Sequence, residues 1–169
     1  YKNNPFAYAI LWKHHASQKA ADRINLIAKK TNQPWLDNFG GKISSEWGIP
    51  KLLQIYQENR EIYDRMSVWI EAADWIVWML TGIESHSYST MEFKTIWDQQ
   101  TGFPTKDFFR KVEAGFEEKV IDKLGKNFLP VAAKAGGLTA KMAEMTGLSE
   151  GTPVSTGMVD AYASLPAVG

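Results

Sequence analysis

Asp160 is the residue of this chain best placed to do chemistry, because it follows a strand-like segment at a turn. Residues 152–162 read Thr-Pro-Val-Ser-Thr-Gly-Met-Val-Asp-Ala-Tyr. Pro153 suits the start of a strand, and Gly157 permits a sharp turn or a close approach to the backbone. A carboxylate beyond the carboxyl end of a strand lies where open α/β sheets bind ligands. Asp160 is therefore a candidate catalytic group, and capping of a helix that begins near Ala161 is the alternative.

Distant segments supply side chains that would complete a site around Asp160. Lys94 can hold a hydroxyl or neutralise developing charge, and the face of Trp12, beside His14 and His15, can pack on the apolar face of a sugar ring. The carboxylate would accept a proton from a hydroxyl. Each residue also has an ordinary interpretation: Lys94 as a solvated charge, and Trp12 as a core residue.

The composition is that of a globular chain large enough to bury a core. Its 169 residues are 44% hydrophobic and 22% charged, with a formal net charge of +0 and no Cys. A nucleic-acid-binding protein would normally carry a basic excess, so we expect no nucleic-acid partner. Zinc bound by thiolates is excluded, and the lack of disulfides fits the cytoplasm.

No apolar run approaches the roughly 20 residues of a membrane helix, so we expect no membrane partner. The chain starts without Met and stops inside what reads as an unfinished element, residues 166–169. We therefore expect a fragment of a longer protein.

Familiar ligand-binding motifs do not occur. The sequence has no GxxxxGK[ST] or GxGxxG loop to cradle phosphate, no GxSxG and no HExxH. Adjacent histidines do not share a helix face, so His14 and His15 do not form a metal-binding pair. We expect no metal site made by protein ligands.

Apolar periodicity predicts a mainly helical chain with a few strands. Helices are expected over residues 16–30, from Ser44 or Ser45 to about 59, over 61–65, 70–80, 106–112 and 140–146, with another over 117–124. Caps are expected from Thr105, Thr139, Gly82 and Gly147. Residues 6–12 read as a strand, whereas 31–42, 84–101 and 128–137 read as irregular. Trp75 and Trp78 are expected to be core residues of a buried helix.

Several strings resemble FGGY carbohydrate kinases, and in particular their ribulokinase branch. These are Leu-Trp-Lys-His-His-Ala at 11–16, Ala-Asp-Arg-Ile-Asn at 21–25, Gly-Gly-Lys-Ile-Ser-Ser-Glu-Trp at 40–47, Ile-Pro-Lys-Leu-Leu-Gln at 49–54, Glu-Ala-Ala-Asp-Trp-Ile-Val-Trp at 71–78, Leu-Thr-Gly at 80–82, Phe-Lys-Thr-Ile-Trp at 93–97, Ala-Gly-Gly-Leu-Thr at 135–139 and Val-Asp-Ala-Tyr-Ala-Ser at 159–164. They run from end to end in family order.

The resemblance implies an α/β fold, the helix-rich part of a ribonuclease H-like (actin-like ATPase) domain. Residues 1–169 would form the later part of the N-terminal, sugar-binding domain. The nucleotide-binding domain would lie outside this chain. The family's Asp-x-Gly-Thr phosphate turn is not in the sequence either. Because the chain lacks the nucleotide-binding half, we expect it to be inactive alone.

The resemblance also implies residue roles in ATP-dependent sugar phosphorylation, with ribulose converted to ribulose 5-phosphate. Asp160 would be the general base, Lys94 would contact the substrate, and Trp12 would lie by the sugar. ATP and Mg2+ would be bound mainly by parts of the enzyme outside this chain. The remaining partners are the sugar itself and a second copy of the chain, in a cytoplasmic homodimer.

Two departures from the family pattern leave the sugar open. The usual Gly-Asn-Val-Asp-Ala-His is here Gly-Met-Val-Asp-Ala-Tyr at 157–162, and the usual Thr-Ala-Gly-Tyr-Lys is Thr-Met-Glu-Phe-Lys at 90–94. The departures fall at Met91, Glu92, Met158 and Tyr162. Another ketopentose such as xylulose, or a related polyol, is the alternative substrate. A non-catalytic binding or assembly module is the alternative from a different class.

Overall fold

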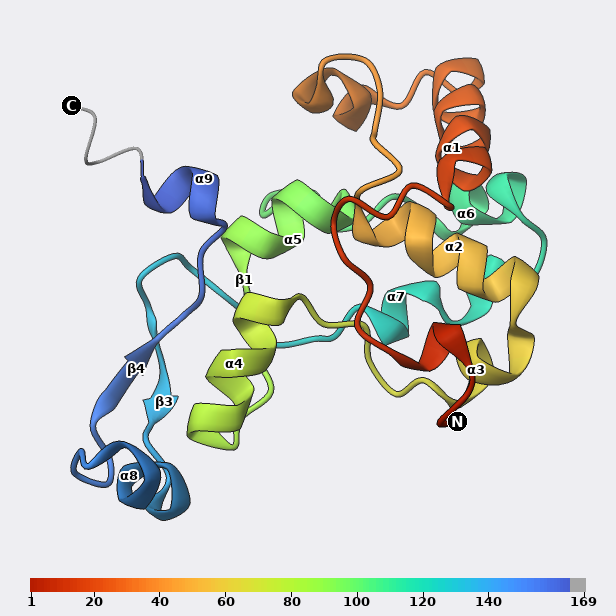
Figure 1. The fold of residues 1–169 in the computed structure, drawn as a ribbon. Helices are drawn as coiled ribbons and strands as arrows, with labels where there is room; N and C mark the ends of the chain where they lie inside the picture. The colour runs from red at the N-terminus through yellow and green to blue at the C-terminus, as the bar shows by residue number, and fades with distance from the viewer. Residues whose placement is uncertain (165–169) are drawn as a thin grey trace. The chain divides into compact units, whose positions relative to one another are not determined.

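The computed structural model describes residues 1–164, which divide into two compact units (Figure 1). The first unit contains Tyr1–Trp69 and Lys94–Leu124. The second contains Ile70–Phe93 and the chain from Gly125 onward. The expected unfinished element at 166–169 lies outside the described residues.

The first unit is helical. Its elements are η1 (Pro5–Ala7), α1 (Gln18–Lys30), η2 (Pro34–Phe39), α2 (Gly48–Glu58), α3 (Arg60–Arg65), α6 (Lys106–Val112), η3 (Phe116–Glu118) and α7 (Val120–Lys123). Helix α1 lies against α2 and α6, and η3 lies against α6 and α7 (Figure 1). The apolar residues expected to form the inner face of α1 are buried: Ala20, Ile24, Ile27 and Ala28. The periodicity therefore predicted both this helix and its orientation.

An aromatic cluster forms the core of the first unit. Tyr63, Phe109 and Phe116 are buried, and Tyr56 meets Tyr63 and Phe116 at ring-centroid distances of 4.9 and 5.2 Å. Interplanar angles of 87° and 65° place ring edges against ring faces, the arrangement that aromatic quadrupoles favour. Tyr56 also donates its hydroxyl to the Ala114 carbonyl at 2.9 Å, which satisfies the polar end of the ring.

The second unit combines short strands with helices. Its elements are α4 (Ala72–Thr81), β1 (His86–Ser87), α5 (Tyr88–Thr95, whose last two residues belong to the first unit), β2 (Phe128–Leu129), β3 (Lys134–Gly137), α8 (Ala140–Thr146), β4 (Pro153–Ser155) and α9 (Asp160–Ala163). β1 pairs parallel with β2, and β3 pairs antiparallel with β4. Helix α4 packs against both strands of the β3–β4 pair (Figure 1).

Local capping and turn signals predicted several boundaries correctly. Pro153 begins β4, and α6 and α8 have the expected bounds. The hydroxyls of Thr105 and Thr139 accept N–H groups of Phe108 and Met142 at 3.2 and 3.3 Å. Gly82 and Gly147 end α4 and α8 at φ values of 71° and 73°. These signals succeed because they depend on neighbouring residues alone.

The expected strand at 6–12 is wrong. These residues form η1 and irregular chain, and Leu11 and Trp12 are 62% and 63% exposed. An apolar run resembles a strand, but no neighbouring strand pairs with it among the described residues. The expected cap from Ser44 or Ser45 is also wrong, because Trp47 occupies the N-cap of α2.

Two segments expected to be irregular have regular structure. Residues 84–101 contain β1 and α5, and residues 128–137 contain β2 and β3. Their pairings join segments distant in sequence, so local patterns did not reveal them. The core assignment of Trp75 is wrong too, since its side chain is 50% exposed, whereas Trp78 is half-buried.

Gly157 makes the close backbone approach that its place in the sequence predicted. A Cβ at this position would lie 2.9 Å from the Ala73 Cβ and 3.1 Å from the Ala73 carbonyl carbon. The second contact involves the backbone of α4, which has little freedom to move. The segment that leads to Asp160 is thereby packed directly on α4.

We predict that Gly157→Ala lowers the free energy of unfolding by about 1–3 kcal/mol, because the added methyl overpacks this contact. Chemical denaturation followed by circular dichroism measures the change. Ser155→Ala, in the same segment but exposed, is the control and should stay within about 0.5 kcal/mol of the wild type. Equal stability of Gly157→Ala and the control would show that the methyl fits.

Candidate active site

Asp160 is exposed at the first residue of α9. The expected capping role is not found, because Val159 is the N-cap residue of α9 and no side chain caps this helix. Asp160 Oδ1 accepts the N–H of the next residue, Ala161, at 2.8 Å. Oδ2 has no hydrogen-bond partner among residues 1–164, so one carboxylate oxygen stays open to a ligand.

Lys94 lies in the last turn of α5 and is half-buried. The chain leaves this helix through Ile96, which is 2% exposed and has a φ of 54°. A β-branched residue in this left-handed region is strained, and burial of its side chain holds it there. The end of α5, and with it Lys94, is thus set by packing in the first unit.

Trp12 is an exposed side chain on a tightly held loop. The ammonium of Lys51, from α2, donates to the carbonyl oxygens of Leu11 and Trp12 at 2.7 and 3.3 Å. Lys51 is 3% exposed, so these contacts compensate the burial of its charge. The interpretation of Trp12 as a core residue is wrong, and its indole face is available to a ligand.

His15, close to Trp12 in the sequence, contacts Ser45. His15 Nδ1 lies 3.1 Å from the Ser45 hydroxyl, and the Ser17 hydroxyl donates to the Ser45 carbonyl at 2.6 Å.

Asp160 belongs to the second unit, whereas Trp12 and Lys94 belong to the first. Convergence of the three side chains stays a prediction.

The residues that depart from the family pattern differ in exposure. Met91 is buried at 2%, Glu92 and Met158 are half-buried, and Tyr162 is 42% exposed. The Tyr162 ring meets Phe93 edge to face at 5.7 Å and 85°. Of the four, Tyr162 presents the most surface to a ligand near Asp160.

A buried carboxylate in the second unit was not singled out from the sequence. Asp74, from α4, is 1% exposed, and it accepts the Ser87 N–H at 3.0 Å and the Thr90 hydroxyl. His86 Nδ1 lies 4.0 Å from it. Burial raises the pKa of Asp74, while the hydrogen bonds from Thr90 and Ser87 oppose that rise. An acid in the middle of the apolar run at 70–80 was the available signal.

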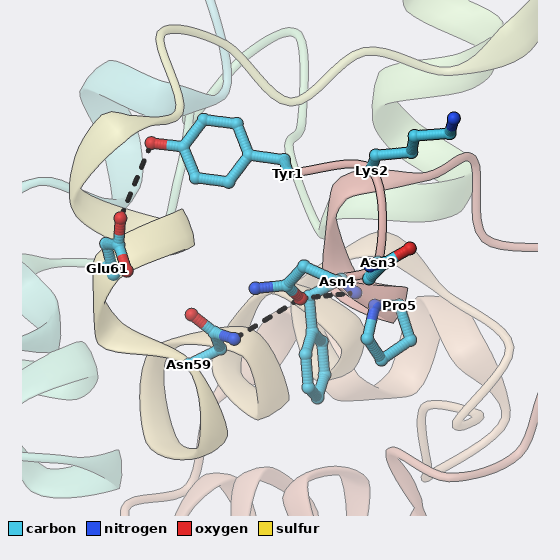
Figure 2. Close-up of a pocket in the computed structure, with 8 residues that line it drawn as sticks. Tyr1, Lys2, Asn3, Asn4, Pro5, Asn59 and Glu61 are labelled. Carbon is cyan, nitrogen blue, oxygen red and sulfur yellow. Dashed lines mark hydrogen bonds between the residues drawn. The ribbon is translucent and has the colours of Figure 1, made fainter.

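A pocket lies between the N-terminal segment and the start of α3. Its walls are residues 1–6 with Asn59 and Glu61 (Figure 2). The Tyr1 hydroxyl reaches Glu61 at 3.5 Å, and Asn4 Oδ1 accepts the Phe6 N–H and the Asn59 amide at 3.0 and 3.3 Å. These polar groups pair with one another and hold the segment in place. None of the predicted site residues lines this pocket.

Residues 1–164 offer neither a metal-binding cluster nor a membrane-spanning helix. No three His, Asp or Glu side chains within them lie together so that they could hold a metal ion. No helix in the same residues is long and apolar enough to cross a membrane.

The chain belongs to the FGGY family of carbohydrate kinases, whose N-terminal domain model matches residues 1–166. It is 47% identical over 169 residues to a ribulokinase from Bacillus licheniformis and 43% identical to one from Geobacillus thermodenitrificans. Both matches cover 100% of this chain, but only 31% and 30% of those proteins. The resemblance seen in the sequence is thereby confirmed.

Solved structures of sugar kinases share the fold. A xyloylose kinase from Brucella ovis matches with a TM-score of 0.71 at 19% identity, covering 91% of this chain and 30% of that one. A xylulose kinase from Rhodospirillum rubrum matches at 0.69 and 22%, covering 89% and 30%. The predicted fold class, a helix-rich part of an actin-like ATPase domain, is confirmed.

We predict that Lys51→Met destabilises the first unit by about 1.5–3 kcal/mol, because it removes charge-assisted hydrogen bonds to the Trp12 loop. Methionine keeps an unbranched apolar stem of similar length. Thermal unfolding and limited proteolysis would measure global stability and opening of residues 11–16. Lys42→Met, at an exposed site, is the control. Unchanged protection of the loop would contradict the holding role of Lys51.

A second prediction follows from the raised pKa of Asp74. The folded state binds the carboxyl proton of Asp74 more tightly than the unfolded state does. The stability that this proton contributes is therefore fully present below the ordinary pKa of 3.8 and is lost as pH rises through the raised pKa. Asp74→Asn does not titrate. Its stability relative to the wild type should therefore increase as pH rises above about 3.8, measured by urea denaturation. A pH-independent difference would contradict the raised pKa.

Proposed function

We propose that the protein containing this chain phosphorylates a ketopentose with ATP, ribulose being the first choice, and that Asp160 is the general base. The observation that carries this proposal is the 47% identity with a ribulokinase over the whole chain. The strings at 11–16 and 40–47, which the sequence shares with the ribulokinase branch, favour ribulose within the family.

The proposed reaction is an in-line phosphoryl transfer. A terminal hydroxyl oxygen of the sugar attacks the γ-phosphorus of ATP, and the bond between that phosphorus and the β,γ-bridging oxygen breaks. ADP leaves, and the hydroxyl proton passes to the Asp160 carboxylate. Such transfers depend mainly on positioning and on electrostatic stabilisation.

The geometry of the predicted residues is compatible with these roles. Asp160 is exposed and has one carboxylate oxygen that is not engaged by residues 1–164. The exposed indole of Trp12 offers a face to the C–H groups of a sugar, while Lys51 holds its backbone. A half-buried Lys94 would contact a sugar hydroxyl. Each of these features supports the role proposed for its own residue.

Mg2+ would accompany ATP, as in other phosphoryl-transfer enzymes. Residues 1–164 contain no cluster of acidic or histidine side chains suited to a metal ion. The phosphates of ATP and residues beyond this part of the chain would have to supply its ligands. No role of Asp160 proposed above depends on the ion.

Two alternatives remain distinguishable by experiment. Xylulose or a related polyol would be the substrate if Tyr162 and its neighbours reshape the pocket. A non-catalytic binding or assembly module would use the same fold without turnover. The exposed, partly unengaged carboxylate of Asp160 favours a kinase over such a module.

We predict that the full-length protein releases ADP with ribulose in preference to other sugars and that Asp160→Asn lowers kcat by about 100- to 10,000-fold, the usual contribution of a general base. A coupled ADP-release assay across ketopentoses, aldopentoses, pentitols and glycerol measures both. Folding of the variant is checked by its thermal unfolding midpoint.

Each outcome of this assay has a distinct meaning. Turnover with xylulose or a polyol instead of ribulose would change the substrate and keep the mechanism. Wild-type kcat in Asp160→Asn would refute the proposed base. A folded protein that binds ATP but turns over no sugar would favour the binding module.

A further inference from the structure

Helix α9 is too short to hold Asp160 in place by itself. It has four residues, and isolated helices of that length are unstable in water. The orientation of the carboxylate must therefore come from contacts outside the helix. Among the described residues of the second unit, α5 and α4 provide them.

The most direct contact is made by Ser89 in the first turn of α5. Its hydroxyl oxygen accepts the N–H of Val159 at 3.2 Å, and Val159 is the N-cap residue immediately before Asp160. Ser89 is 8% exposed, so its hydroxyl competes little with water for this bond. A second contact, between the rings of Phe93 and Tyr162, joins α5 to the third residue of α9.

Ser89 is itself fixed by a buried network. The Asp74 carboxylate accepts the Ser87 N–H and the Thr90 hydroxyl, one residue on either side of Tyr88 and Ser89. The Ser89 N–H donates to the Ser87 hydroxyl at 3.2 Å. Asp74, Ser87 and Thr90 are each at most 2% exposed. Buried polar groups that are fully paired are held rigidly, because breaking one bond leaves a costly unpaired group.

We infer that Ser89 is a positioning residue for Asp160 and that Asp74 holds Ser89 in place. The hydrogen bond to Val159 sets where α9 begins, and this fixes the direction of the first side chain of the helix. The inference rests on the proposed role of Asp160 as the base. Neither Ser89 nor Asp74 touches the reacting atoms; both act through the backbone of the segment before Asp160.

The first test is Ser89→Ala in the full-length protein. We expect kcat to fall by about 10- to 100-fold, because small displacements of a catalytic group have effects of that order. KM for the sugar should change less than threefold, by our estimate, since Ser89 positions the base and not the substrate. Ser155→Ala is the matched control, because Ser155 is exposed on β4 in the same approach to Asp160.

A double-mutant cycle separates positioning from general destabilisation. If Ser89 acts through the carboxylate, Ser89→Ala should cost little additional kcat in an Asp160→Asn background. Equal losses in both backgrounds would overturn the inference, since they would show an effect independent of Asp160. Unchanged kcat in Ser89→Ala would also overturn it, while loss of kcat in Asp160→Asn would still support the base.

Two substitutions at Asp74 test the anchor. Asp74→Asn keeps an oxygen for the Ser87 N–H, and its amide can donate to the Thr90 hydroxyl, which then donates to the Ser87 carbonyl 2.9 Å away. We expect Asp74→Asn to retain most of kcat and Asp74→Ala to lose about as much as Ser89→Ala. If both variants lost kcat equally, or if neither lost any, the role of Asp74 would be refuted. Wild-type kcat in Asp160→Asn would instead remove the base on which the inference rests.

Discussion

Burial of the Asp74 carboxylate is the constraint on which much of the second unit depends. A carboxylate that is 1% exposed is stable only when its oxygens are hydrogen-bonded. The Ser87 N–H and the Thr90 hydroxyl meet this need, so β1 must end and α5 must begin beside α4. These two bonds determine which side of α5 presents Ser89. They thereby determine where the segment before Asp160 is hydrogen-bonded, through Val159.

The first unit uses a buried charge of the opposite sign in a similar way. Lys51 cannot reach solvent, and the carbonyl oxygens of Leu11 and Trp12 are acceptors that compensate its ammonium. The loop backbone is held while the Trp12 indole stays exposed. In both units, therefore, a buried ionisable side chain holds a stretch of backbone that carries or leads to an exposed candidate residue.

Short elements and a loop carry the candidate site residues. Asp160 begins a four-residue helix, Lys94 ends an eight-residue helix, and Trp12 lies on a loop. Ends of elements expose side chains that helix interiors would pack against neighbours. Such short elements have low intrinsic stability, and the hydrogen bonds made by Lys51, Asp74 and Ser89 offset it.

The sequence by itself determined the family, the apolar face of α1 and the caps at Thr105 and Thr139, and it limited Gly157 to a sharp turn or a close approach. Each of these depends on residue type and near-neighbour spacing, which a linear pattern records. Only the tertiary structure decided that residues 6–12 are not a strand, that α5 exists, and that Trp75 is exposed. The roles of Lys51, Asp74 and Ser89 emerged there as well. The physical reason is that strand pairing, compensation of buried charge and side-chain hydrogen bonds join groups 13 to 70 residues apart, and no local pattern specifies which of them will meet.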